Sequence, residues 1–393
     1  MSSELVVIVA AKRTPIGAFQ GALSAAAAPE LGAAAIAGAI TDSGVAAGDI
    51  DQVLMGCVLP AGLGQAPARQ AAISAGIPVG AACTTVNKMC GSGMETIMLG
   101  NDLLKAGSAS VVVAGGLESM TNAPYLLPKS RRGYRMGHQE VLDHMFYDGL
   151  QDPWQGQMMG HYAEETAKKY GFSRDEQDAF AIESVNRAQS AVADGSFADE
   201  ISPVTMSTRK GDVTLDTDET PGTVSVEKIP TLRPAFAKDG TVTAATSSSI
   251  SDGASALILM TASEAERRGL EPIATLVGHS SFAQEPAWFT TSPVAAIRNL
   301  HEQLGWSPDN VDLYEVNEAF AVVTMAAMKD VGLDHARVNV NGGACALGHP
   351  IGASGARITT TLLYALKARG LKRGIASLCI GGGEAVAVGV ELT

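Results

Sequence analysis

The sequence is organised around one stretch, Thr84-Thr85-Val86-Asn87-Lys88-Met89-Cys90-Gly91-Ser92-Gly93-Met94, in which a single cysteine precedes a Gly-Ser-Gly turn. An apolar run with helical spacing follows and ends at Lys105, which predicts a buried helix. Cys90 is therefore expected at a helix N-terminus, where unpaired N–H groups and the helix dipole favour a thiolate. The two glycines are expected to let a substrate approach the backbone closely. An isolated cysteine is more often a buried structural thiol, so the residues that accompany Cys90 decide its chemistry.

The bulk composition narrows the classes of protein. The 393 residues are 46% hydrophobic and 18% charged, which predicts a globular chain of two or three domains. A net charge of −13 argues against nucleic-acid binding. Five cysteines without a CxxC spacing predict neither a disulfide framework nor a metal site. We expect no membrane span, because no apolar run reaches 18 residues, and we expect a cytoplasmic protein, because residues 1–11 resemble neither a secretion signal nor a transit peptide.

The first 120 residues alternate apolar runs with helical patterns, which predicts an α/β half with a mostly parallel, covered sheet. Residues 121–249 are polar and irregular, so they are expected to form an inserted loop domain for ligand binding and assembly. Within it, Ser173 and Glu176 mark the start of one helix that runs on from 179 to 192. The expected strands cover residues 5–10, 51–58, 110–116 and 256–260, and the expected helices of the first half cover about 31–42 and 67–75.

The two ends of the chain resemble each other. Gly93 precedes Lys105 by the same spacing as Gly355 precedes Lys367, and each helical pattern is followed by an apolar strand and a glycine pair or triplet. A duplicated α/β half is the simplest explanation. The predicted division is therefore an N-terminal half, 1–120, completed by 250–270, then the insertion, 121–249, and a C-terminal half, 271–393.

Three further motifs could carry chemistry. His349 lies in a glycine-rich loop that opens a helix, and histidine accepts protons near neutral pH. Cys379 ends a strand before Gly381, where a thiol could act beside backbone N–H donors. Asn317 follows a strand and could position a water or donate to an oxyanion. All of these residues end strands or open helices, which is where α/β sheets place their sites.

The motifs Asn87 to Gly93, Asn317-Glu318-Ala319-Phe320, Asn341 to Gly355 and Cys379 to Gly383 resemble, in order and spacing, the four signature motifs of the thiolases. The resemblance covers nearly the whole chain and is closest to the short-chain class. It implies a five-layer αβαβα fold of two similar halves. It also implies the thiolytic cleavage of acetoacetyl-CoA by coenzyme A and the reverse Claisen condensation of two acetyl-CoA molecules.

The resemblance further implies a role for each motif. Cys90 would carry the acyl group as a thioester, His349 would take its proton, and Cys379 would move the proton at the substrate α-carbon. Asn317, through a water, would form one oxyanion hole with His349, and the backbone N–H groups of Cys90 and Gly381 would form the other. This chemistry needs an acyl carrier, an α-carbon base and two places for negative oxygen.

Matched positions in the insertion, together with one in the C-terminal half, imply the coenzyme A site. The residues expected to contact or flank the pantetheine chain are Ser248, Ala244, Phe236, Phe320, Leu150 and Met159. For the apolar ones, ordinary core packing is the alternative reading. Acyl-CoA and coenzyme A would be substrates, with no permanently bound cofactor. The oligomeric state usual in the family implies a homotetramer.

The sequence also departs from the family pattern. Met158 replaces a histidine common in short-chain members, which puts one polar substrate contact in doubt. Cys345 replaces an aliphatic residue in the His349 loop, where it is either an oxidation-sensitive neighbour or a small buried hydrophobe. Phe289 stands at an acyl-pocket position, where its bulk would favour short acyl groups.

Four alternatives remain open at this point. They are a thiolase for longer 3-ketoacyl chains, a ketoacyl synthase-like condensing enzyme, an inactive coenzyme A-binding scaffold and a Cys-His protease. The pair of cysteines and the Asn-Glu-Ala-Phe motif argue against the synthase, and a protease would leave Cys379 and the duplication unexplained.

Overall fold

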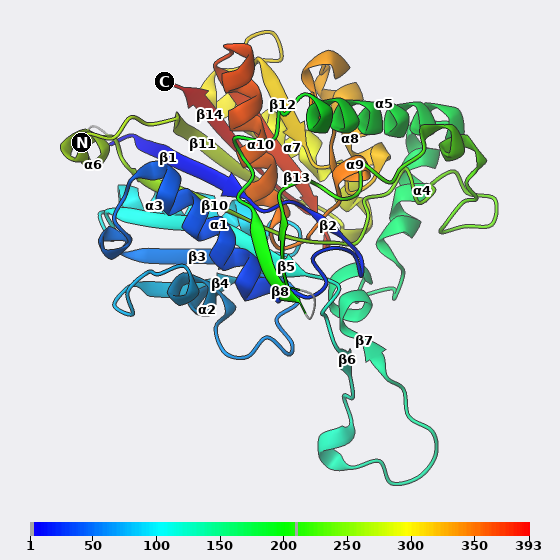
Figure 1. The fold of residues 1–393 in the computed structure, drawn as a ribbon. Coiled ribbons are helices and arrows are strands. Elements are labelled where there is room, and N and C mark those ends of the chain that lie inside the picture. The colour runs from blue at the N-terminus through cyan, green and yellow to red at the C-terminus, as the bar shows by residue number, and fades with distance from the viewer. Residues whose placement is uncertain (1–3, 209–210) are drawn as a thin grey trace.

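The computed structural model describes residues 4–208 and 211–393 (Figure 1). Residues 1–3, which belong to the predicted N-terminal half and to the stretch searched for a signal, lie outside the described residues. So do Arg209 and Lys210 of the predicted insertion. Across the described ranges, no helix is long and apolar enough to cross a membrane, and no group of three or more His, Cys, Asp or Glu side chains is arranged to hold a metal ion.

One ten-stranded sheet runs through both halves of the molecule in the order β12-β13-β14-β11-β1-β10-β5-β3-β4, with the short β2 paired to β10. The two halves join where β1 pairs with β11 over Val6–Ile8. The strands are β1 Val6–Arg13, β2 Gly17–Ala18, β3 Gln52–Gly56, β4 Ala82–Val86, β5 Val111–Ser119, β10 Ser251–Thr261, β11 Ala274–Ala283, β12 Leu313–Val316, β13 Arg373–Ile380 and β14 Glu384–Leu392.

The prediction of a mostly parallel sheet is wrong. Only β3–β4, β3–β5 and β12–β13 pair in parallel, and the other strand pairs of this sheet are antiparallel. Parallel neighbours need a crossover, which the helices supply. By contrast, β14 follows β13 after a three-glycine turn, and β10 arrives from the insertion. Strand direction was therefore set by connections that the apolar patterns do not reveal.

The five-layer αβαβα arrangement is confirmed. Helices α1 and α2 pack on one face of the N-terminal strands, and α7 and α8 pack on the outer face of β12–β14. Helices α3 and α10 lie between the two halves of the sheet and share one buried core with both (Figure 1). The helices of these layers are α1 Ala28–Ser43, α2 Pro67–Ser74, α3 Ser92–Lys105, α7 Ser292–Leu304, α8 Ala321–Val331 and α10 Ser354–Arg369.

Glycines at the first turns of α3 and α10 let these two helices come unusually close. A Cβ on Gly355 would lie 2.4 Å from the backbone nitrogen of Met94, and a Cβ on Gly93 would lie 2.9 Å from that of Ala356. Side chains at these positions would push the helices apart. Gly93 and Gly355 therefore serve helix packing, whereas the sequence predicted that Gly91 and Gly93 let a substrate approach the backbone.

The insertion forms a layer beside the C-terminal half, one protruding arm, and a strand pair, β8 Val204–Thr208 with β9 Gly211–Leu215, that packs on the core of the N-terminal half (Figure 1). The helix predicted from Ser173 is confirmed as α5, where the Ser173 hydroxyl accepts from the Glu176 N–H and the Glu176 carboxylate accepts from the Ser173 N–H. The arm extends from the β6–β7 pair, and its residues 127–141 are all exposed. The elements here are β6 Tyr125–Leu126, β7 Leu142–Asp143, a π-helix Met145–Leu150, α4 Met159–Tyr170, α5 Arg174–Ala193, β8 Val204–Thr208 and β9 Gly211–Leu215.

The close crossing of α3 and α10 predicts that a side chain added at Gly355 destabilises the fold. Gly355→Ala should lower the free energy of unfolding by about 1–3 kcal/mol, because the added methyl overlaps backbone atoms that cannot move without separating the helices. Gly48→Ala is the matched control, since open space surrounds a Cβ at Gly48. Chemical denaturation followed by circular dichroism measures both variants, and equal effects of the two would contradict this account of the crossing.

Candidate active site

An apolar cavity of about 280 Å³ lies where the two halves and the insertion meet. Cys90 from the N-terminal half, and His349 and Gly381 from the C-terminal half, line the same cavity. Its polar wall also includes the Ser247–Ser249 segment. The apolar wall consists of Met120, Phe146, Leu150, Met158, Met159, Phe236, Ile250, Phe289, Ala319, Phe320 and Ile351. The cavity therefore brings together residues that lie more than 250 positions apart in the chain.

A tight elbow before α3 presents Cys90. Met89 has a left-handed backbone, with φ of 47°, which turns the chain sharply just before the cysteine. The Ser92 hydroxyl accepts from the Lys88 N–H at 2.8 Å and donates to the Met89 carbonyl at 2.6 Å. Burial raises the pKa of the Cys90 thiol to about 11, and hydrogen bonding from the backbone N–H groups of Gly381 and Cys90 opposes that rise. The resting group is a neutral thiol that faces two backbone donors.

Two contacts fix the tautomer of His349. The Ser354 hydroxyl donates to the Pro350 carbonyl at 2.9 Å, so it accepts the Nδ1–H of His349, whose nitrogen lies 2.5 Å away. The Asn317 amide nitrogen lies 3.5 Å from Nε2 of His349. Both contacts leave Nε2 as the acceptor nitrogen. Burial, with a smaller effect from the charge of Arg357, lowers the pKa of His349 to about 3, so the ring is neutral.

Cys379 and Asn317 lie behind the cavity wall. Cys379 is fully buried in an apolar cluster with Tyr162, Phe289 and Phe320. Burial raises the pKa of its thiol well above the ordinary value, and the proximity of Cys90 raises it further. Asn317 is 1% exposed and reaches the site through its contact with His349. Both predicted residues therefore adjoin the site, although neither forms the cavity surface.

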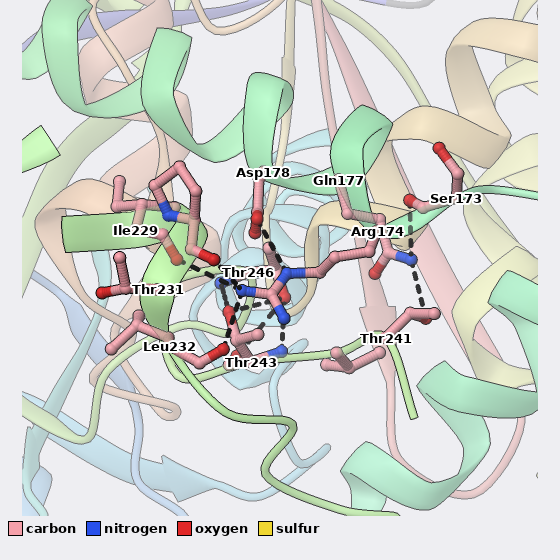
Figure 2. Close-up of polar contacts among 12 residues, drawn as sticks. Ser173, Arg174, Gln177, Asp178, Ile229, Thr231, Leu232, Thr241, Thr243 and Thr246 are labelled. Atoms are coloured by element: carbon pink, nitrogen blue, oxygen red, sulfur yellow. Dashed lines mark hydrogen bonds and ion pairs between the residues drawn. The ribbon is translucent and has the colours of Figure 1, made fainter. Parts of the chain in front are cut away.

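The segment predicted to bind coenzyme A is anchored to α4 and α5. In Figure 2, the Arg174 guanidinium of α5 donates to the Ile229 carbonyl at 3.2 Å and the Leu232 carbonyl at 2.9 Å. Gln177 on the next turn donates to the Thr241 hydroxyl at 2.9 Å (Figure 2). The carboxylate of Glu164 in α4 accepts from the backbone of Thr241. These contacts fix the loop that carries Phe236 and leads to Ser248.

Most of the predicted coenzyme A residues line the cavity. Leu150, Met159, Phe236, Ser248 and Phe320 are all on its surface, and the rings of Phe236 and Phe320 meet edge to face at 5.9 Å. The Ser248 hydroxyl donates to the Ala319 carbonyl at 3.1 Å.

Ala244 is the exception. It is exposed and does not line the cavity, because it lies in the turn between Thr243 and Thr246, whose hydroxyls and backbone bond to each other. At this position the structure does not bring the predicted residue to the cavity.

The structure shows where the three residues that depart from the family pattern lie. Met158 and Phe289 both line the cavity, so this wall is apolar where a histidine was considered. Phe289 is 3% exposed and meets Tyr162 edge to face at 6.4 Å, which fixes its ring. Cys345 is buried beside Phe180 and Met325, and its thiol points to the Glu318 carbonyl at 3.7 Å. Of the two readings of Cys345, the small buried hydrophobe fits.

Three site residues escaped the sequence analysis. Ser354, Arg174 and Glu118 act through contacts that no local pattern reveals. Glu118 at the end of β5 accepts from the N–H groups of Val58 and Gly352, each at 2.9 Å, and so ties the His349 loop to the N-terminal half. Burial raises the pKa of Glu118 to about 7. A serine in a Gly-Ala-Ser-Gly turn and a glutamate at a strand end carried no distinguishing signal.

Comparisons with known proteins agree along the whole chain. The model of the thiolase N-terminal domain matches residues 6–263, and that of the thiolase C-terminal domain matches residues 270–392. An acetyl-CoA acetyltransferase of Pseudomonas aeruginosa is 50% identical over 386 residues, which cover 98% of each chain. One of Schizosaccharomyces pombe is 46% identical and covers 98% of each chain. The crystal structure of the Bacillus anthracis acetyl-CoA acetyltransferase superposes with a TM-score of 0.97 at 41% identity, covering 100% of this chain and 99% of that one. The chain belongs to the thiolase family.

Because Ser354 fixes the tautomer of His349, we expect the reactivity of the Cys90 thiol to depend on Ser354. Ser354→Ala leaves the buried Nδ1–H without its acceptor, and an unsatisfied buried donor costs about 1–3 kcal/mol. We expect alkylation of Cys90 by iodoacetamide at pH 7 to slow by about tenfold, because the ring no longer holds Nε2 ready for the thiol proton. Ser255→Ala is the control, since its hydroxyl is equally buried and bonds Thr360 of α10. Similar slowing in both variants would contradict the assignment.

Proposed function

We propose that this protein is an acetyl-CoA C-acetyltransferase that cleaves acetoacetyl-CoA with coenzyme A and condenses two acetyl-CoA molecules in reverse. The observation that carries the proposal is the meeting of Cys90, His349 and Gly381 on one apolar cavity. The names of the full-length relatives from Pseudomonas aeruginosa and Schizosaccharomyces pombe support the same substrate. The inactive-scaffold alternative is not favoured, because the sequence retains Cys90, His349 and Cys379.

In the first half of the proposed cleavage, His349 takes the proton of the Cys90 thiol through Nε2. The thiolate sulfur forms a bond to C3 of acetoacetyl-CoA, and the C2–C3 bond breaks. The released carbanion of acetyl-CoA takes a proton from the Cys379 thiol, which adjoins Cys90. Acetyl-CoA leaves, and the acetyl group stays on Cys90 as a thioester.

In the second half, the Cys379 thiolate takes the proton of the coenzyme A thiol, and the coenzyme A sulfur forms a bond to the acetyl carbon. The bond from that carbon to the Cys90 sulfur breaks, and Cys90 regains its proton from Nε2 of His349, which completes a ping-pong cycle. Negative oxygen would be stabilised by the backbone N–H groups of Cys90 and Gly381, and by His349 together with a water held by Asn317. The hydrogen bonds of the first pair toward the Cys90 sulfur support this role. Losing one such donor typically costs about 3 kcal/mol of activation free energy.

We also propose the binding roles implied by the sequence. Phe236, Phe320, Leu150 and Met159 would enclose the pantetheine chain, and Ser248 would bond it. Their positions on the cavity support these roles, whereas the exposure of Ala244 does not place it in the same wall. Coenzyme A and acetyl-CoA are substrates here, with no permanently bound cofactor.

The proposed organisation has an N-terminal half of 1–120 completed by 250–270, an insertion of 121–249, and a C-terminal half of 271–393. The pairing of β10 between β1 and β5 supports the completion. We propose a homotetramer in the cytoplasm. An exposed arm that presents Tyr125, Leu127, Met136 and Val141 supports assembly through the insertion, because isolated chains seldom project such side chains together.

The first test is direct. The purified chain should convert acetoacetyl-CoA and coenzyme A to acetyl-CoA, as measured by chromatography of the thioesters. Cys90→Ala should abolish turnover and should not gain the mass of one acetyl group when it is incubated with acetyl-CoA. Cys57→Ala is the control, because that thiol is buried and lies outside the cavity lining. Turnover by the Cys90 variant, or none by the unchanged chain, would refute the proposal.

A second test separates short-chain from longer-chain thiolysis. Phe289 lines the cavity with a fixed ring, so Phe289→Ala should open space and raise kcat/KM for 3-ketohexanoyl-CoA relative to acetoacetyl-CoA by about tenfold. Phe146→Ala is the control, because Phe146 also lines the cavity but is 40% exposed. A wild-type preference for the longer thioester would favour the longer-chain thiolase instead.

A further inference from the structure

A buried arginine lies one turn into α10, away from the surface of the cavity. Arg357 is 1% exposed, and among the described residues none of its three guanidinium nitrogens has a hydrogen-bond partner. Its Nη1 lies 3.7 Å from a carboxylate oxygen of Glu315, which makes an ion pair longer than a hydrogen bond. Because a guanidinium keeps its proton in proteins, a full positive charge with five donors is enclosed there.

Acceptors without partners lie beside this charge. Within the described chain, Glu315 Oε1 and Glu200 Oε2 are buried and have no hydrogen-bond partner. Glu200 reaches α10 through the hydroxyl of Thr361, one turn beyond Arg357, which donates to it at 3.1 Å. Buried polar groups are almost always paired, and gaps among them hold internal water that bonds two to four groups. The chemistry of this enclosure therefore calls for bound water.

The enclosure lies directly behind His349. Arg357 follows Ser354 by three residues on α10, and Ser354 holds Nδ1 of His349. Glu315 precedes Asn317 by two residues at the end of β12, and Asn317 contacts Nε2. Both groups that orient the ring thus belong to the elements that form the enclosure, and the positive charge of Arg357 disfavours a second positive charge on the ring.

We propose that Arg357, hydrated by internal water shared with Glu315 and Glu200, is a positioning residue whose charge makes His349 a weaker base toward the Cys90 proton. The inference rests on the proposed function only in treating His349 as the base for Cys90. After burial, the charge of Arg357 is the second cause of the lowered pKa of His349. The other charged groups that act on this enclosure or on Cys90 are Glu318, Asp218, Arg13, Arg369 and Glu118.

The test reads the Cys90 thiol without any acyl-CoA. The rate of alkylation by iodoacetamide is followed against pH in the full chain, and peptide mapping confirms Cys90 as the modified residue. Arg357→Met removes the charge, so the imidazole becomes a stronger base and forms the imidazolium–thiolate pair more readily. We expect alkylation at pH 7 to accelerate by about tenfold, as for a shift of about one pH unit. Arg357→Lys keeps the charge and should follow the wild-type profile.

Thr361→Val is the matched control, because it removes an uncharged buried contact to Glu200 from the same helix. It should leave the pH profile unchanged. An unchanged or slower Arg357→Met, an Arg357→Lys profile shifted in the same way, or an equal shift in Thr361→Val would each overturn the proposal.

A crystal structure of the unchanged protein gives a measurement that does not depend on whether the variants fold. Ordered water within hydrogen-bond distance of Arg357 and of Glu315 or Glu200 supports the enclosure, and a dry enclosure overturns it. Failure of the proposed function is distinguishable, because a chain that alkylates as expected but does not cleave acetoacetyl-CoA refutes the activity alone.

Discussion

The site depends on the close crossing of α3 and α10. Cys90 lies two residues before α3 and His349 five residues before Ser354, the first residue of α10, so the contact between the first turns sets the separation of the two side chains. Gly93 and Gly355 make that contact possible, since each faces backbone atoms of the other helix. Close packing transmits displacement, and a shift of about 1 Å at a reacting centre costs a large factor in rate. The duplicated glycines thus link the stability of the central layer to the geometry of the chemistry.

The buried loops around the site contain polar groups that need hydrogen-bond partners. Carboxylates that lie at or just after the ends of strands supply these partners. Glu118 binds the N–H groups of two loops, and Glu318 accepts from Ser184 at 2.7 Å and from Asn339 at 2.8 Å. Each carboxylate therefore replaces several hydration contacts and holds a loop of the candidate site in place. The buried Arg13 at the end of β1 forms ion pairs with Glu200 at 2.5 Å and with Asp218 at 2.7 Å. These two ion pairs connect the insertion to β1. Removing one partner of such a pair is far more damaging than replacing both.

The sequence predicted the structural features that depend on interactions between residues close together in the chain. The helix after Cys90 and the capped start of α5 were predictable because apolar periodicity and a capping box act within a few residues. The direction of β10 and β14 was not, because it depends on where the chain returns. Motifs also identified Cys90 and His349, whereas Ser354 and Arg174 act through atoms that only folding brings near. Gly93 shows the same limit, since the sequence indicated that something approaches its backbone closely but did not reveal that this is the neighbouring helix α10.

The resting charge state of the site follows from these constraints. Burial raises the pKa of Cys90 to about 11 and lowers that of His349 to about 3, so both groups are neutral at pH 7. A permanent thiolate–imidazolium pair would demand hydration that an apolar cavity cannot supply. Charge then has to appear when a thioester fills the cavity, at the moment when the backbone donors and the Nε2–H that His349 gains from Cys90 face the developing oxyanion. Electrostatic stabilisation placed in this way acts on the transition state more than on the resting protein, and that difference is the part of binding that accelerates a reaction.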